Sequence, residues 1–178
     1  MHIMKLKLIL GLTLILGSAV LGAASTTDDN RAPEIPANCD IAVPAGHGVA
    51  FHAYALGVQI YKWDGATWTF VGPEADLYAS AKYRGRVATH YAGPIWESNS
   101  GSLVVGSAAL PCNVDATAIP WLRLTAASSS GPGIFDGVTY MHRTKTVGGM
   151  RPTTPGTTID QEARIPYTAE YYFYKEEN

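Results

Sequence analysis

The densest group of side chains capable of chemistry lies in the stretch HYAGPIWE, residues 90–97. It holds an imidazole, a carboxylate and a large aromatic ring around a Gly-Pro bend. If the bend brings its two ends together, His90 acts as a general acid or base and Glu97 orients it, with Tyr91 and Trp96 binding the ligand. The competing interpretation is a structural turn, with Trp96 in the core and Glu97 paired with a surface arginine.

A second hypothesis is a metal site made by His52, His90 and Glu97, because imidazole nitrogen and carboxylate oxygen suit zinc or copper. The sequence has no His-x-His or Cys-x-x-Cys pair that would support it. We therefore assign no metal ligand and predict no cofactor.

The third group is aromatic. Trp63 and Trp68 flank the turn Asp64-Gly65-Ala66-Thr67, and Asp-Gly between two aromatic-rich runs is a strong hairpin signal. A tryptophan exposed at such a tip provides a stacking surface for a sugar or another flat ligand. The alternative is that both rings pack in the core.

The elements that carry these residues belong to an exported chain. Residues 1–24 have a positive head (Lys5 and Lys7), a short apolar run and small residues before Ala24, as in a cleavable signal peptide. The polar, proline-bearing residues 25–38 are predicted to be a flexible leader and residues 39–175 the folded domain. We expect a secreted or periplasmic protein with no transmembrane segment after cleavage.

The charge balance excludes one class of partner. The mature chain would have 11 basic and 15 acidic residues, and its lysines and arginines are scattered. No basic patch for nucleic acid is present. A small molecule, a glycan or another envelope component remains open as the partner.

Both cysteines, Cys39 and Cys112, lie in the exported part. In an oxidising compartment two cysteines most simply form a disulfide. A thiol nucleophile would need a neighbouring histidine, and neither cysteine has one in sequence.

Short runs rich in β-branched and aromatic residues, separated by Gly, Pro, Asn, Asp and Ser, predict a single all-β domain with little helix. About eight or nine strands are expected, in an antiparallel β-sandwich or a closed β-barrel. One helical turn or two is expected in residues 73–82 (PEADLYASAK). The main runs are VAFHAYAL (49–56), QIYKW (59–63), WTFV (68–71), VTYMHRTKTV (138–147) and TAEYYFY (168–174).

Five stretches, in this order, resemble a largely exported family of bacteria and fungi that is catalogued only as a domain of unknown function. The resemblance spans roughly residues 33–175 and implies one exported β domain, with no activity or catalytic residue to transfer. His142 stands where the resemblance leads us to expect glutamine. The stretches are GVQIY (57–61), HYAGPIWE (90–97), IPWL (119–122), TVGG (146–149) and IPYTAEY (165–171).

Three functions therefore remain open. The leading hypothesis is a non-catalytic binding or envelope-associated module that uses an aromatic surface or a barrel mouth. The alternatives are a small enzyme built on His90 and Glu97, and a metal-binding protein.

Overall fold

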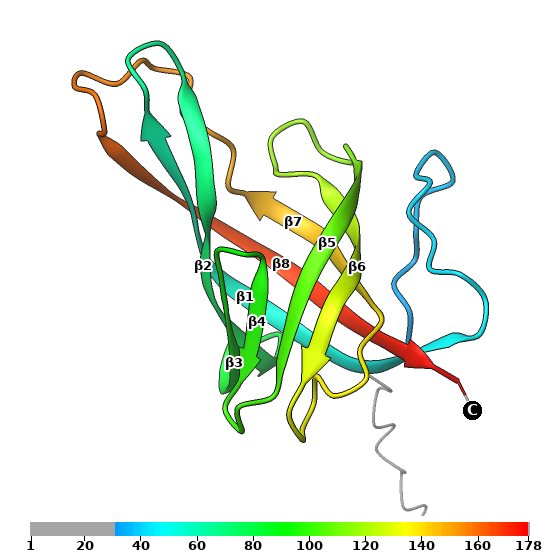
Figure 1. Cartoon of the computed structure of the whole chain (residues 1–178). Helices are drawn as coiled ribbons and strands as arrows, with labels where there is room; N and C mark the ends of the chain where they lie inside the picture. The colour runs from blue at the N-terminus through cyan, green and yellow to red at the C-terminus, as the bar shows by residue number, and fades with distance from the viewer. Residues whose placement is uncertain (1–30, 178) are drawn as a thin grey trace, which may run out of the picture.

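A computed structural model describes residues 31–177. Eight antiparallel strands form one closed barrel in which each strand pairs with the next and β8 pairs with β1 (Figure 1). The prediction of an all-β domain is confirmed. Of the two expected architectures, a β-sandwich and a closed β-barrel, the structure shows the barrel. The strands are β1 (His47–Trp63), β2 (Trp68–Ser80), β3 (Arg84–Tyr91), β4 (Ile95–Ser98), β5 (Leu103–Cys112), β6 (Trp121–Ser130), β7 (Tyr140–Gly148) and β8 (Glu162–Glu176).

The turn at Asp64-Gly65 forms as expected. The Asp64 carboxylate accepts hydrogen bonds from the backbone N–H groups of Ala66 and Thr67, each at 2.8 Å. Gly65 has a φ of 99°, which a residue with a side chain rarely adopts. The sequence thus encodes the β1–β2 hairpin locally.

The helical turn expected within residues 73–82 is wrong. Most of this segment belongs to β2, where Ala75 and Leu77 alternate into the buried core. Their period of two matches a strand with one face against the interior. Across residues 31–177 there is no helix, and hence none that could cross a membrane.

Inside the barrel, small side chains lie among large ones. Ala53 and Ala55 of β1 are fully buried in the same cluster as Trp96, Tyr171 and Phe173. β1 and β8 make the longest pairing in the barrel, and small residues there leave room for the large rings.

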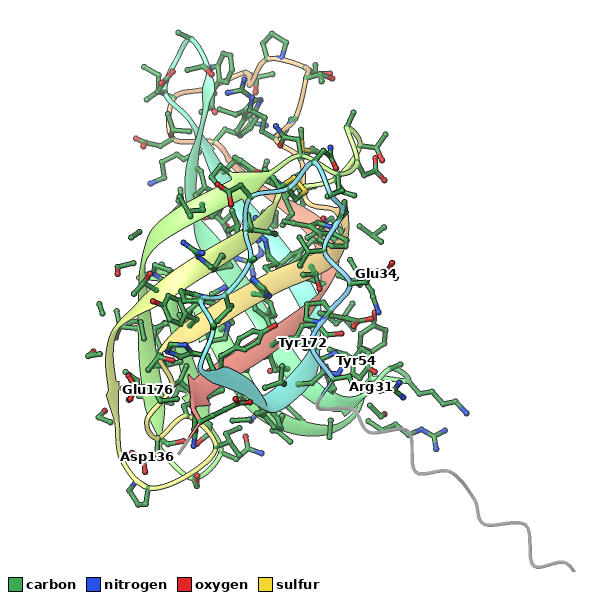
Figure 2. The ribbon with its side chains drawn as sticks, turned by 90° about the vertical axis from the view of Figure 1, so that its right-hand side faces the viewer. Arg31, Glu34, Tyr54, Asp136, Tyr172 and Glu176 are labelled. Carbon is green, nitrogen blue, oxygen red and sulfur yellow. A yellow bond between two sulfur atoms is a disulfide. The ribbon has the colours of Figure 1, made fainter. Side chains whose placement is uncertain are left out.

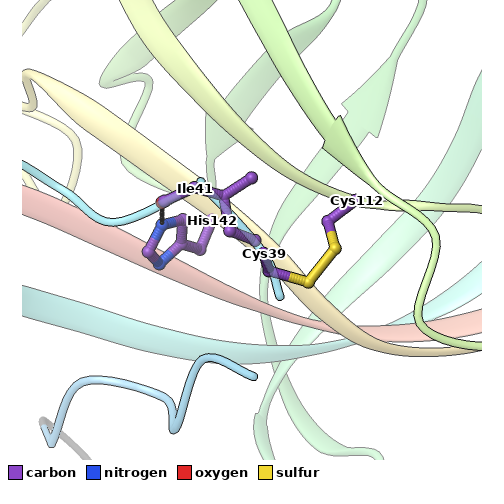
Figure 3. Close-up of a disulfide and its surroundings, with 4 residues drawn as sticks. All are labelled: Cys39, Ile41, Cys112 and His142. Carbon is purple, nitrogen blue, oxygen red and sulfur yellow. Dashed lines mark hydrogen bonds between the residues drawn. A yellow bond between two sulfur atoms is a disulfide. The ribbon is translucent and has the colours of Figure 1, made fainter. Parts of the chain in front are cut away.

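Residues 31–46 precede β1 and lie against the outside of the barrel (Figure 2). The Cys39–Cys112 disulfide, confirmed in the structure, ties this segment to β5. Ile41 is fully buried, and its carbonyl oxygen accepts a 2.6 Å hydrogen bond from Nε2 of His142 (Figure 3). His142 is therefore a buried anchor for this segment. The signal peptide predicted for residues 1–24, and the leader as far as residue 30, lie outside the described residues.

Candidate functional site

The β3–β4 hairpin is shorter than the strands beside it, so the barrel wall is incomplete beyond its turn (Figure 1). β3 pairs with β2 only as far as Glu74, and β4 pairs with β5 only as far as Val105. Beyond these points no described strand lies between residues 68–73 of β2 and residues 107–112 of β5. We call this gap in the wall the notch.

Apolar side chains are exposed on both edges of the notch. Phe70 and Val71 of β2 are 56% and 50% exposed, and Leu110 of β5 is 41% exposed. On the β5 edge the register shifts between Ser107 and Leu110, and Ala108 has a φ of 44°. Such a bulge bends a strand edge and redirects its side chains. The notch is thus an apolar opening in an otherwise closed wall.

A cavity of about 270 Å³ lies behind the notch. It reaches the surface beside Phe70 and Val71, which line it and are half exposed. Most of its wall is apolar, and His90, Arg143 and Tyr171 are the polar exceptions. The lining residues are Phe70, Val71, Gly72, Pro73, His90, Gly93, Pro94, Trp96, Ala109, Leu122, Leu124, Arg143 and Tyr171.

His90 is held rigidly in this wall. Its Nδ1 donates a 2.8 Å hydrogen bond to the carbonyl oxygen of Ile95, and its ring stacks on Trp96 with centroids 4.2 Å apart. Burial lowers the pKa of His90 to about 3, outweighing the bond to Ile95. The ring is therefore neutral at neutral pH, and Nε2 is left as an acceptor.

Arg143 brings a positive charge into the same wall, although it is only 9% exposed. Nε and Nη2 both donate to one acceptor, the carbonyl oxygen of Pro120, at 3.2 and 2.9 Å. Among the described residues Arg143 has no carboxylate partner. Two other donors of the cavity wall, the O–H of Tyr171 and Nε1 of Trp96, are buried with no acceptor in the described chain, and the Tyr171 oxygen lies beside Arg143 and the Tyr167 hydroxyl.

The structure separates His90 from Glu97. His90 pairs with Trp96 across the β3–β4 hairpin, and both side chains are buried inside the barrel. Glu97, one residue further on, lies on the outer surface, where it accepts a 2.9 Å hydrogen bond from the Tyr91 hydroxyl. Of the four residues singled out here, two line the cavity and two lie outside it.

Trp63 and Trp68 lie together at the end of the β1–β2 hairpin, with ring centroids 5.5 Å apart. Both are buried, and Nε1 of Trp68 donates to the carbonyl oxygen of Thr154 in the β7–β8 loop. Gly156 of the same loop packs directly on Trp63. In this structure the two rings are therefore packing partners of that loop.

His52 lies on the outer face of β1, away from the cavity. It donates a 3.0 Å hydrogen bond to Glu170, which also accepts from Tyr172 at 2.6 Å and pairs with Lys145 at 3.1 Å. Figure 2 shows Tyr172 close to Tyr54, Arg31 and Glu34 on this face. Within residues 31–177, no three His, Cys, Asp or Glu side chains are grouped so that they could hold a metal ion.

Sequence reasoning missed Arg143 and Glu170, and it expected Tyr171 on a buried face without giving it a functional role. A signal for Arg143 exists, because it shares its strand face with Met141, which is fully buried. An arginine in the inward register of an alternating strand is unusual, since charged residues are seldom buried without a partner. In β8 the alternation of Ala169, Tyr171 and Phe173 predicts a buried face, as observed, but it gives no sign that the Tyr171 hydroxyl reaches a cavity or that Glu170 belongs to an outer cluster.

Comparison with known proteins gives one match. No curated protein and no solved structure matches the chain. Residues 44–175, which include the whole barrel except its last residue, Glu176, match a family profile described as "Protein of unknown function (DUF3455)". The chain belongs to this family.

Proposed function

We propose that this protein is a non-catalytic binding module that holds a small, mainly apolar molecule inside its barrel. The observation that carries the proposal is the cavity of about 270 Å³ behind the notch, apolar in most of its wall. Ligand sites are typically concave and apolar with a few polar groups that fix orientation. The exposed Phe70, Val71 and Leu110 give such a molecule an apolar path to the cavity.

The volume limits the size of the ligand. An apolar cavity of about 150 Å³ holds a benzene molecule. A cavity of about 270 Å³ therefore suits a ligand of roughly ten to twelve non-hydrogen atoms. The ligand would be a small ring system or a medium-length chain.

The setting of this activity is the outside of the cell or the periplasm. The signal-peptide pattern of residues 1–24 and the Cys39–Cys112 disulfide both support export to an oxidising compartment. A small binding module there would collect or deliver apolar molecules at the envelope. No observation favours the enzyme hypothesis, because His90 and Glu97 lie on opposite faces of the barrel wall.

The test is titration of the mature protein with 1-aminonaphthalene, a neutral fluorescent probe of about the size the cavity admits. Ala109 lines the cavity at its rim and is exposed, so Ala109→Phe blocks the opening without filling the core. We expect affinity for the probe to fall about tenfold or more, because the added ring occupies space that the probe needs. Fluorescence enhancement measures it.

Ala79→Phe is the matched control, because Ala79 is an exposed residue of β2 that does not line the cavity. It should leave probe affinity unchanged. Equal affinity of both variants and the wild type, or no binding to the wild type, would rule out the cavity as the binding site.

A further inference from the structure

The positive charge of Arg143 stands alone in the barrel interior. Each ion pair among the described residues involves other side chains, and the cluster around Glu170 lies on the outer face. The charge nevertheless acts across the interior. Burial raises the pKa values of Tyr61, Tyr167 and Tyr171, and the Arg143 charge offsets part of that rise. A buried charge without a counter-charge is costly.

Two hydrogen-bond donors in the same cavity wall as Arg143 have no acceptor among the described residues. Nε and Nη2 of Arg143 donate to the carbonyl oxygen of Pro120, and the Tyr171 oxygen lies beside the same guanidinium and the Tyr167 hydroxyl. The O–H of Tyr171 and Nε1 of Trp96, both almost fully buried, have no acceptor in the described chain. Arg143, Tyr171 and Trp96 line one cavity, so a ligand there meets an excess of donors and one net positive charge.

We propose that the ligand of this cavity is a small monocarboxylate, whose carboxylate binds Arg143 and the Tyr171 hydroxyl. The inference rests on the binding function proposed above and specifies its ligand class. The apolar body of the molecule lies against Leu122 and Leu124 and points toward the notch. A guanidinium matches a carboxylate in both charge and geometry.

The charge count favours a carboxylate over a phosphate. The other titratable groups of the cavity wall, His90 and Tyr171, are neutral at neutral pH, because burial lowers the pKa of His90 to about 3 and raises the pKa of Tyr171. The cavity therefore offers a single positive charge, which balances a monoanion and leaves a phosphate dianion half compensated. The ceiling of roughly a dozen non-hydrogen atoms also excludes a large lipid.

The decisive experiment compares octanoate with octanamide, which has nearly the same shape and no charge, by calorimetric titration of the mature protein. We expect octanoate to bind the wild type at least about tenfold more tightly, a difference typical of a charge-assisted contact. Arg143→Met should abolish this preference, because both ligands then meet an apolar wall. Arg143→Lys should restore part of it.

A second variant tests the inference if the Arg143 variants do not fold. Tyr171→Phe removes a hydroxyl whose O–H has no acceptor in the described chain, so the fold should tolerate the loss of its contacts with Arg143 and Tyr167. It should weaken octanoate several-fold and leave octanamide unchanged. Tyr174→Phe is its matched control, because Tyr174 is buried in the same strand but lies on the outer face beside His142 and does not line the cavity.

The outcomes separate the two proposals. If 1-aminonaphthalene binds and octanoate has no advantage over octanamide, including the case where neither binds, the carboxylate inference is overturned and the binding function stands. If none of the three molecules binds, the proposed binding function itself fails. A preference for octanoate that survives in Arg143→Met would place the anion elsewhere and also overturn the inference.

Discussion

A single step along β4 moves a side chain from the cavity to the outer surface. Trp96 stacks on His90 inside the barrel, and Glu97 accepts a hydrogen bond from Tyr91 outside it. The two faces give neighbouring residues opposite environments, because successive side chains in a strand point to opposite sides. Whether a residue of this strand faces the cavity or the solvent therefore depends on whether its position is even or odd.

His90 should make the stability of the protein depend on pH. Its folded pKa of about 3 is below the value near 6.5 in the unfolded chain, so the unfolded state binds a proton first as the pH falls. The stability contributed by the neutral ring is complete above about pH 6.5 and is lost as the pH falls toward 3. At pH 5 the loss is about 2 kcal/mol.

His90→Asn should remove this dependence, because asparagine can still donate to the carbonyl oxygen of Ile95 but does not titrate in this range. We expect the free energy of unfolding of the wild type, relative to the variant, to fall by about 2 kcal/mol between pH 7.5 and pH 5 in urea titrations. Glu97→Gln, on the exposed face of the same hairpin, is the control. Parallel pH curves for the wild type and His90→Asn would contradict this assignment.

At this scale the sequence predicted some residues well and others poorly. It brought out His90 and Trp96, which do line the cavity, because they stand in a dense local motif. It could not exclude that Glu97 joins them, since a bend at Gly93-Pro94 is compatible with either arrangement. Arg143 comes from a strand about 50 residues further along the chain, and only the closed barrel places it beside His90.

Among the elements, the short β3–β4 hairpin determines where the barrel can be reached. Its turn packs against β2 at Gly72, where an added Cβ would lie 2.7 Å from the Cβ of Ala92. β4 begins only at Ile95, opposite Val105, whereas β5 continues from there to Cys112 without β4 beside it. The sequence predicted the bend at Gly93-Pro94 but not its consequence, because the lengths of the neighbouring strands β2 and β5 decide whether a gap remains.

The approach of β1 to β2 at Gly57 is a second constraint at the level of elements. A Cβ built on Gly57 would lie 2.2 Å from the carbonyl oxygen of Glu74 and 2.4 Å from the Cβ of Ala75. Backbone and a buried side chain cannot yield there without shifting a strand. We expect Gly57→Ala to lower the free energy of unfolding by about 2 kcal/mol or more, measured by chemical denaturation.

The comparison variant is Gly101→Ala, at a turn with a φ of 85° and no atom near the added Cβ. It should cost only the strain of the left-handed conformation, roughly 1 kcal/mol. Equal losses of the free energy of unfolding in the two variants would mean that the close approach of β1 to β2 at Gly57 adds no cost of its own.

In the whole molecule, the barrel is closed by β1 and β8 and covered on part of its outer face by residues 31–46. Alternation and turn signals predicted the all-β class and nearly the number of strands. They left sandwich and barrel open, because closure depends on the pairing of strands more than 100 residues apart. The disulfide was predictable from the compartment and from having only two cysteines.

Glu170 lies on this closure and connects three strands. It accepts hydrogen bonds from His52 of β1 and Tyr172 of β8 and pairs with Lys145 of β7. Burial alone would raise the pKa of Glu170, but these three partners outweigh it and lower the pKa to about 2. The ionised form is thus favoured by folding, and it stabilises the barrel where its ends meet.

The closure should therefore weaken in acid within a defined range. Because the folded pKa of Glu170 is below its unfolded value near 4.5, its contribution is complete above about pH 4.5 and is lost as the pH falls through 2. Glu170→Gln should be less stable than the wild type at pH 7 by about 2 kcal/mol, and this difference should shrink toward zero by pH 2. Glu74→Gln, which removes an exposed partner of Arg164, should change stability little at any pH. Denaturant titrations measure the free energy of unfolding of the wild type and of Glu170→Gln. If the difference between them stayed constant from pH 7 to pH 2, the ionised carboxylate of Glu170 would not be what stabilises the closure.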